Sequence, residues 1–246
     1  IDIANKIDYQ SLGTVEFIVD VQSDKSDPPF FFLEMNTRLQ VEHPVTEEIL
    51  NMDLVELQIN IALGKSLNID SNKVMPRGHA IEARIYAEDA KNDFLPSPGD
   101  IKKLDLPTVG RLDFGVRSGD QISTFYDPML GKIIVHGDSR EKARAHLAAC
   151  LKGMYVRGIE TNKDFLGYVL NSKLFKEDMI QITDLDNLAL QFKKLLPESI
   201  EVIGAALIVL SSESQIKNKM WRLWGSGATS ILLKQLERNY EIKISS

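Results

Sequence analysis

Residues 30–48 read FFFLEMNTRLQVEHPVTEE, an apolar run that changes within a few positions into carboxylates, amides, a guanidinium and an imidazole. The apolar part predicts a β-strand, because bulky aromatic and aliphatic side chains are enriched in strands. The segment TVEFIVD at 14–20 has the same character, and the polar VQSDKSDPP between the two runs is typical of a turn. The sequence therefore predicts a β-hairpin whose turn lies near Lys25.

The hairpin is predicted to bring two carboxylates together. With that turn, Glu16 lies opposite Glu34, and Asn36 follows two positions later on the same face of the strand. Facing carboxylates repel each other unless a shared proton, a basic partner or a divalent cation neutralises them. The other face, which includes Phe17 and Leu33, is expected to be core. A solvated acidic sheet face is the alternative explanation for the two glutamates.

Polar side chains then follow at alternate positions of the predicted loop. The guanidinium of Arg38 offers a planar fork for a carbonate or phosphate anion, the amide of Gln40 can donate a hydrogen bond, and Glu42 can act as a base. This spacing predicts an extended loop that faces a small anion. His43 precedes Pro44 and is expected to order the loop rather than to take part in catalysis.

The rest of the chain predicts a mixture of helices and strands. An amphipathic helix is expected over residues 45–65, with Thr46 as its N-cap and Gly64 as its end. Further elements are expected as a strand at 78–89 and helices at 140–154 and 161–175. The pattern changes near Pro197, the expected boundary of a small extra module. Lys132 is expected to be a solvated lysine.

Composition narrows the class of protein. The 246 residues carry a formal net charge of −6, which argues against a nucleic-acid partner, because such partners bind a basic face. A single cysteine, Cys150, excludes a disulfide framework within the chain. No apolar run approaches the roughly 20 residues that span a bilayer, so no membrane partner is expected.

Several motifs together resemble a known family. GTVEF at 13–17 and FLEMNTRLQVEHPVTE at 32–47 resemble the C-terminal part of the ATP-grasp domain of biotin carboxylases. The motifs that resemble the biotin carboxylase C-terminal domain are GHAIEARIYAED at 78–89, FLPSPG at 94–99, GVRSGD at 115–120 and YDPMLGK at 126–132. The resemblance covers roughly residues 11–183, and the motifs keep the family's order.

The resemblance implies an α+β fold. The expected parts are the C-terminal part of an ATP-grasp fold with its antiparallel sheet, the mixed α/β biotin carboxylase C-terminal domain and a partial small C-terminal module. Their expected bounds are 1–70, 71–186 and 197–246. The last part resembles the start of the connecting region towards the biotin carrier domain in acyl-CoA carboxylases of the methylcrotonyl or propionyl type.

The resemblance also implies roles for individual residues. The expected ligands of Mg²⁺ or Mn²⁺ are Glu16, Glu34 and Asn36. The expected ATP contacts are Glu16, Ile18, Leu33 and Glu34. The expected bicarbonate contacts are Arg38, Gln40, Val41 and Arg84, and the expected catalytic residues are Arg38, Glu42 and Arg84. In this assignment Glu42 deprotonates bicarbonate, and Arg84 also binds biotin and stabilises its enolate.

The implied activity is that of the biotin carboxylase component of an acyl-CoA carboxylase. ATP and bicarbonate form carboxyphosphate, and biotin on a carrier domain outside this chain is carboxylated. The implied partners are the biotin carrier domain, a carboxyltransferase subunit and a second copy of the chain through the region near Phe114 and Arg117. The expected compartment is the bacterial cytoplasm or, in a eukaryote, the mitochondrial matrix.

Two departures from the family leave alternatives open. Nothing that resembles the family's glycine-rich lid or its ATP-binding lysines precedes Ile1, and no Met-Lys-Met biotin attachment motif is present. The chain is therefore expected to be a fragment without activity of its own. The alternative is a non-catalytic split or decayed subunit that acts as an interaction module. A ligase of another ATP-grasp family is a third, weaker interpretation.

Overall fold

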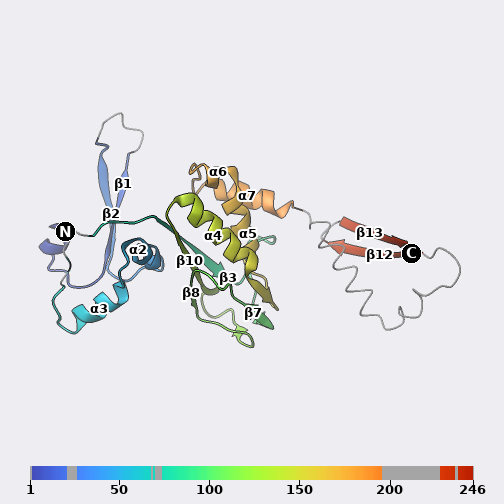
Figure 1. Ribbon diagram of the computed structural model, residues 1–246, viewed down its shortest axis with the longest axis horizontal. Helices are drawn as coiled ribbons and strands as arrows, with labels where there is room; N and C mark the ends of the chain where they lie inside the picture. The colour runs from blue at the N-terminus through green and yellow to red at the C-terminus, as the bar shows by residue number, and fades with distance from the viewer. Residues whose placement is uncertain are drawn as a thin grey trace. The chain divides into compact units, whose positions relative to one another are not determined.

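The computed structural model describes residues 2–20, 27–67, 69, 74–195, 228–235 and 238–245. The chain divides into two compact units, Ile1–Lys193 and Lys194–Ser246 (Figure 1). In the second unit, β12 (Ala228–Gln235) and β13 (Arg238–Ser245) form an antiparallel pair. Most of the predicted C-terminal module, from Pro197 to residue 227, lies outside the described residues.

The predicted hairpin is present in the first unit (Figure 1). β1 (Thr14–Val19) pairs antiparallel with β2 (Phe30–Asn36), and Glu16 lies opposite Glu34 as predicted. The turn predicted near Lys25 lies outside the described residues. Backbone pairing alone therefore places the two carboxylates on neighbouring strands.

The two strands of the hairpin are not in uniform register. After the pair of Glu16 and Glu34, β2 contains one extra residue, and Phe17 pairs with Phe32 rather than with Leu33. An extra residue in one strand is a β-bulge, which a rule of strict alternation does not anticipate. The predicted pairing is therefore wrong from Phe17 onward.

The apolar side chains of the hairpin are exposed rather than buried. Phe17 packs edge to face against Phe30 and Phe32, with ring centroids 5.5 Å and 6.3 Å apart. Even so, Phe17 is 44% exposed and Leu33 is 52% exposed. The predicted burial of this face is therefore wrong for the described residues. A two-stranded sheet has no second layer of its own, so its side chains are buried only where another element covers them.

The long helix predicted after the loop is interrupted. α2 (His43–Leu50) ends at Asn51, which adopts the left-handed conformation with φ 52° and ψ 51°. The next helix, α3 (Leu54–Ala62), is capped by Asp53, whose side chain accepts a hydrogen bond from the backbone N–H of Glu56 at 2.7 Å. The single predicted helix is therefore wrong, because a local stop and a new N-cap outweigh the continuous apolar pattern.

α2 also starts earlier than predicted. Thr46 lies inside the helix instead of capping it, and the first turn contains Pro44, whose restricted φ suits a helix start. Gly64, the predicted end of the long helix, has a φ of 74° just after α3. The early start of α2 matters for the site, since it places the helix directly after Glu42.

A three-stranded antiparallel sheet forms the centre of the first unit. Its strands lie in the order β3 (His79–Tyr86), β10 (Met129–Gly137) and β8 (Arg111–Phe114). α4 (Arg140–Gly153) packs against β10 and β3 (Figure 1). β3 and α4 confirm the strand and the helix that were predicted for these parts of the chain.

The two faces of this central sheet differ in chemistry. One face packs on α4, and its main apolar core contains Ala83, Ile85, Ile133, Val135, Ala143, Leu147, Cys150 and Leu151. The intervening strand positions carry charged side chains at Glu82, Arg84, Arg111, Asp113 and Lys132. α2 packs against β3 and β10, and its Glu47 pairs with Arg111, so α2 covers the charged face.

Short elements complete the first unit. The small sheets pair β4 (Glu88–Asp89) with β5 (Leu95–Pro96), β6 (Gly99–Asp100) with β9 (Gln121–Ile122), and β7 (Lys103–Asp105) with β11 (Tyr155–Arg157). The other helices are α1 (Asp2–Lys6), α5 (Lys163–Asn171), α6 (Lys173–Lys176) and α7 (Asp184–Lys193). The helix predicted over 161–175 is divided between α5 and α6, because Ser172 caps the second one.

Helices and antiparallel strand pairs occur together throughout the first unit, as the predicted α+β class requires. Each helix in the described parts of the chain is too short or too polar to cross a bilayer.

Replacement of Ile133 by alanine tests the apolar face of the central sheet. Ile133 is fully buried, and removal of its buried methyl and methylene groups leaves a cavity. We expect Ile133→Ala to lower the free energy of unfolding by about 2–5 kcal/mol in urea titrations followed by circular dichroism. The matched control is Ile182→Ala, at an exposed position, which should change stability by less than about 0.5 kcal/mol. Equal losses in the two variants would contradict this description of the core.

Candidate functional site

Three predicted metal ligands meet at the end of the hairpin opposite its turn. The side-chain amide of Asn36 donates hydrogen bonds to Glu16 Oε1 at 2.8 Å and to Glu34 Oε1 at 2.9 Å. Gln40 donates to the same oxygen of Glu16 at 3.1 Å. No lysine or arginine of the described residues forms an ion pair with either glutamate. Neutral amide donors therefore hold the two like charges together.

The donor set of this group fits a hard divalent cation. Mg²⁺ prefers oxygen ligands and often takes only one or two carboxylates together with phosphate oxygens of a substrate. Within the described residues, histidine, cysteine, aspartate and glutamate form no group of three or more that could hold a metal ion. The hairpin alone can supply only two carboxylates, from Glu16 and Glu34, and a neutral oxygen from Asn36. The other ligands would therefore come from a nucleotide.

A second group of residues joins the loop to the central sheet. Arg84 Nη2 on β3 donates to Glu42 Oε2 at 2.7 Å, although the two residues are 42 positions apart in the chain. Their side chains are partly exposed, at 38% for Arg84 and 52% for Glu42. An exposed ion pair contributes at most about 1 kcal/mol, so an incoming anion can replace Glu42 on Arg84 at small cost. The contact places a permanent cation beside a possible base.

A buried lysine holds the backbone of the loop. Lys132 Nζ donates to the backbone carbonyl of Val41 at 2.6 Å, and its side chain is only 10% exposed. The prediction of a solvated lysine is therefore wrong, because the loop and α2 cover the strand face on which Lys132 lies. One peptide earlier, His43 Nδ1 lies 2.7 Å from the carbonyl oxygen of Gln40. This contact agrees with the ordering role predicted for His43.

Glu82 is a buried carboxylate between two cations. Its side chain is 5% exposed, and neither oxygen has a hydrogen-bond partner in the part of the chain that the structure describes. Arg84 Nε lies 3.6 Å from Oε1 and Lys132 Nζ lies 3.8 Å from Oε2. These distances are ion-pair distances and are too long for good hydrogen bonds. Burial raises the pKa of Glu82 above its ordinary value, and the charges of Lys132 and Arg84 offset only part of this effect.

Arg111 ties α2 to the same face of the sheet. Arg111 Nη1 donates to Glu47 Oε2 at 2.5 Å, and its Nε lies 3.1 Å from Asp113 Oδ2. The other oxygen of Glu47, which is buried, accepts a hydrogen bond from the backbone N–H of Leu54 at 2.6 Å. One carboxylate therefore links α2, the start of α3 and β8.

Sequence reasoning missed Glu82, Glu47 and Arg111 as parts of this site. A signal was present, because Glu82 and Arg84 occupy alternate positions of a predicted strand and so share one face. The sequence does not say that α2 covers this face.

The predicted site residues fall into two groups in the structure. The hairpin group consists of Glu16, Glu34, Asn36 and Gln40, and the sheet group consists of Val41, Glu42 and Arg84. The loop links the groups, since Gln40 and Val41 are consecutive. Arg38 is exposed and donates to the carbonyl of Leu39 at 3.2 Å, so the structure brings it into neither group. Ile18 and Leu33 are exposed on the hairpin.

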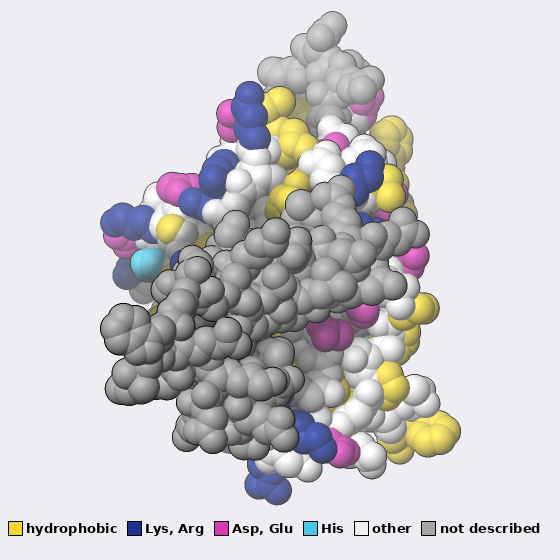
Figure 2. Space-filling model, turned by 90° about the vertical axis from the view of Figure 1, so that its right-hand side faces the viewer, with side chains coloured by type: hydrophobic (Ala, Val, Ile, Leu, Met, Phe, Trp, Pro, Cys, Tyr) yellow, Lys and Arg dark blue, Asp and Glu magenta, His cyan; other side chains and the backbone are white. Residues whose placement is uncertain are grey.

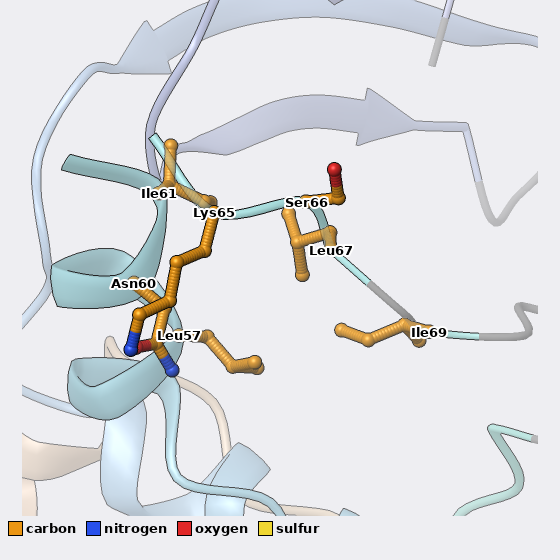
Figure 3. Close-up of a pocket in the computed structure, with 7 residues that line it drawn as sticks. All are labelled: Leu57, Asn60, Ile61, Lys65, Ser66, Leu67 and Ile69. Carbon is orange, nitrogen blue, oxygen red and sulfur yellow. The ribbon is translucent and has the colours of Figure 1, made fainter. Parts of the chain in front are cut away.

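A pocket of about 550 Å³ lies beside α3 (Figure 3). It is lined by Leu57, Asn60, Ile61, Lys65, Ser66, Leu67 and Ile69. Lys65 Nζ already donates to Asn60 Oδ1 at 2.9 Å, and none of the predicted site residues lines the pocket. This pocket is therefore separate from the hairpin group and the sheet group.

The described surface mixes charges of both signs. On the face shown in Figure 2, lysine and arginine side chains lie next to aspartate and glutamate side chains. Pairs such as Lys142 with Asp138, 2.7 Å apart, are well exposed. Such pairs contribute little to stability, in contrast to the buried charges between α2 and the central sheet.

Comparison with known proteins identifies the family. Residues 1–70 match the ATP binding domain of the carbamoyl-phosphate synthase L chain, and residues 82–187 match the biotin carboxylase C-terminal domain. The biotin carboxylase of Halalkalibacterium halodurans is 47% identical over 70% of this chain and 37% of that protein. The chain belongs to the biotin carboxylase family. The resemblance predicted from the motifs is thereby confirmed, and with it the α+β fold.

Two further members of the biotin carboxylase family show how much of a relative the chain spans. The mitochondrial methylcrotonoyl-CoA carboxylase subunit alpha of Glycine max is 43% identical over 76% of this chain and 25% of that subunit. A solved structure is the biotin carboxylase domain dimer of Hydrogenobacter thermophilus 2-oxoglutarate carboxylase in complex with MgADP, ADP and bicarbonate. It is 34% identical with a TM-score of 0.72, over 79% of this chain and 42% of that one. The chain thus spans less than half the length of each of these relatives.

Glu82→Gln tests the buried carboxylate. The folded protein holds the proton of Glu82 more tightly than the unfolded chain does, so this group favours the fold below its unfolded pKa and loses that contribution as pH rises through the raised pKa. From about pH 4 to about pH 8, we expect the unfolding free energy of Glu82→Gln to rise relative to wild type. The expected rise is about 1.4 kcal/mol for each pH unit by which the pKa is raised.

The control for this measurement is Glu141→Gln. A hydrogen bond from Arg144 lowers the pKa of the exposed Glu141, so its carboxylate favours the fold above the unfolded pKa. The unfolding free energy of this variant should therefore fall relative to wild type only as pH rises to the ordinary carboxyl pKa, and the difference should stay constant from there to about pH 8. A difference in unfolding free energy between Glu82→Gln and wild type that does not change with pH in urea titrations would contradict the raised pKa of Glu82.

Proposed function

We propose that this chain forms the bicarbonate- and metal-binding part of the biotin carboxylase component of an acyl-CoA carboxylase. The complete enzyme would use ATP to activate bicarbonate as carboxyphosphate and would then carboxylate carrier-bound biotin. The contact between Arg84 and Glu42 carries the proposal. It brings a permanent cation and a carboxylate base together from distant segments, which is the pair of groups that bicarbonate activation needs.

The chemistry of the loop supports bicarbonate as the ligand. The exposed carboxylate of Glu42 can accept the bicarbonate proton once the anion has taken its place on Arg84. Arg38 and Arg84 would balance the negative charge, because a guanidinium stays protonated in proteins. The side chain of Gln40 and the backbone N–H of Val41 would complete the contacts. Arg84 would also stabilise the enolate oxygen of deprotonated biotin, since a preorganised cation stabilises charge that develops during reaction.

The hairpin supplies the groups proposed for metal and nucleotide. Glu16, Glu34 and Asn36 would hold Mg²⁺ or Mn²⁺, which would neutralise phosphate charge when bound. Ile18 and Leu33 offer exposed apolar surface on the same hairpin for the nucleotide. ATP and Mg²⁺ fit this assignment because one relative is solved with MgADP and bicarbonate.

The remaining active-site groups are proposed to lie on polypeptide other than this chain, which spans 37% of the bacterial relative. Phe30, Phe31 and Phe32 are all exposed on the hairpin, with Phe30 and Phe32 beside Phe17 on one face and Phe31 on the other. Exposed apolar surface of this kind is typical of an interface, which supports a covering part of the enzyme that carries the ATP-binding groups. We therefore expect the isolated chain to lack ATPase and carboxylase activity.

The wider organisation is also part of the proposal. The domain bounds would be 1–70, 71–186 and 197–246, and the partners would be a biotin carrier domain and a carboxyltransferase subunit. A second copy would bind near Phe114, which packs partly on the core, and Arg117, which is exposed. The relatives include a bacterial biotin carboxylase and a mitochondrial subunit, so we propose the bacterial cytoplasm or the mitochondrial matrix as the compartment.

Arg84→Gln is expected to weaken bicarbonate binding by about tenfold or more. This factor corresponds to the loss of one hydrogen bond from a charged donor. Binding is measured on the isolated chain by the NMR line width of isotope-labelled bicarbonate. Arg117→Gln is the matched control, because Arg117 is exposed outside both groups of site residues. Absence of bicarbonate binding to the wild type, or equal binding by both variants, would favour the non-catalytic interaction module instead.

Glu34→Gln is expected to weaken Mn²⁺ binding by at least about tenfold, the loss that is typical even for a residue that only orients a ligand. The amide keeps the shape of the side chain but removes the charge that attracts the cation. Electron paramagnetic resonance titration of free Mn²⁺ measures the affinity. Glu160→Gln, at an exposed position outside the hairpin, is the control. Equal affinities of the two variants would refute the metal assignment.

A further inference from the structure

We infer that Lys132 and Glu82 are a positioning pair that fixes the backbone of residues 38–42, the bicarbonate loop, to the central sheet. Lys132 Nζ donates to the Val41 carbonyl at 2.6 Å and lies 3.8 Å from Glu82 Oε2 and 3.9 Å from Asp113 Oδ2. Val41 and Lys132 are 91 positions apart in the chain. The inference deepens the proposed function, on which it rests for the identity of the anion.

The register of the sheet explains why Lys132 can do this. Lys132 on β10 is the cross-strand partner of Arg84 on β3, so the two cations lie side by side on one face. Lys132 holds the carbonyl of Val41, and Arg84 holds the carboxylate of Glu42. Two neighbouring strands therefore bind two consecutive residues of the loop: β10 binds the backbone of Val41, and β3 binds the side chain of Glu42.

The hydrogen bonds to the loop carbonyls also determine where the backbone N–H groups of the loop point. In a trans peptide the carbonyl and the N–H of the next residue point in opposite directions. The Gln40 carbonyl is bound by His43 and the Val41 carbonyl by Lys132. The N–H groups of Val41 and Glu42 are therefore turned away from these partners, and in the described parts of the chain neither donates a hydrogen bond. Both remain available to an anion.

The carboxylate of Glu82 offsets part of the desolvation cost of the buried Lys132 ammonium group. This carboxylate lies between Lys132 and Arg84, the two cations that hold the loop. A buried ion pair of this kind is often no more stable than apolar side chains of the same volume. The other face of the same strands shows that apolar packing is available to this sheet. Lys132 and Glu82 therefore contribute position rather than stability.

The test compares Lys132→Met with the double variant Glu82→Gln, Lys132→Met in the full chain. Methionine keeps the length of the side chain but cannot donate to Val41. The single variant leaves the buried Glu82 with only the partly exposed Arg84 as a cationic partner, so its melting temperature should fall. The double variant removes both charges, so its melting temperature should recover. In both variants the Val41 carbonyl has lost its donor. If Lys132 only stabilised the fold, the double variant would behave as wild type once its stability is restored. A positioning role predicts that the loop is still altered in the double variant.

Two measurements report the position of the loop. Native-state hydrogen exchange of the His43 and Val45 amides, which donate to Gln40 and Glu42, should speed up by about tenfold or more in both variants. Exchange at Ala143 in α4 should not change, because its hydrogen bond to Ser139 lies on the other face. Bicarbonate affinity, measured by NMR line width, should fall by a similar factor in both variants. Lys142→Met, which breaks an exposed ion pair, is the control and should behave as wild type.

The outcomes separate this inference from the proposed function. If the double variant recovers wild-type melting temperature, loop exchange and bicarbonate affinity together, Lys132 and Glu82 act only through stability and the inference is wrong. If wild type does not bind bicarbonate, the proposed function fails, and the exchange data alone then support or overturn the anchoring of the loop. Fast exchange with weak bicarbonate binding in the double variant, at wild-type melting temperature, supports both.

Discussion

Strand β10 carries Ile133 on one side and Lys132 on the other, and the rest of the structure depends on this alternation. Consecutive side chains of a strand point to opposite faces of its sheet. One face of the central sheet therefore packs on α4 as an apolar core, and the other holds charges beneath α2 and the loop. The same three strands supply an apolar core on one side and charged side chains of the proposed site on the other.

The charged face has a cost in stability that its geometry only partly offsets. Arg111 and Glu47 satisfy each other through a direct hydrogen bond at 2.5 Å. Glu82 has cations on both sides but no hydrogen bond within the described residues, and burial raises its pKa. Attraction between buried charges repays their desolvation only when the geometry is good. Apolar contacts could hold α2 on the sheet equally well, but they could not orient the carbonyl of Val41.

The hairpin contributes to the site in a different way. Backbone pairing brings Glu16 and Glu34 together, and the amides of Asn36 and Gln40 hold them there. Its apolar side chains stay exposed, which agrees with a chain that spans only part of each biotin carboxylase relative. The loop is the link, since Gln40 contacts the hairpin and Val41 contacts the sheet. The cation site and the anion site that we propose on neighbouring residues would suit a reaction between a metal-bound nucleotide and bicarbonate.

The sequence by itself determined the features that depend on neighbours along the chain. The pairing of Glu16 with Glu34, the strand around Arg84 and the helix after Ser139 follow from local turn signals and side-chain periodicity. The family followed from the motifs of the loop and of β3. Local signals also had limits, because the bulge that pairs Phe17 with Phe32 leaves no distinct mark in the residue pattern.

Only the tertiary structure decided which faces are covered. Lys132 is buried because the loop, 91 positions away, lies over it. Glu82 is buried on the same covered face, without a hydrogen bond from the described residues. Phe17 and Leu33 remain exposed because no layer of the described chain covers the hairpin. Periodicity assigns a side chain to a face, but the burial of that face depends on contacts between residues far apart in the sequence. Those contacts, and not the local pattern, turn a lysine on a strand into an anchor for the site.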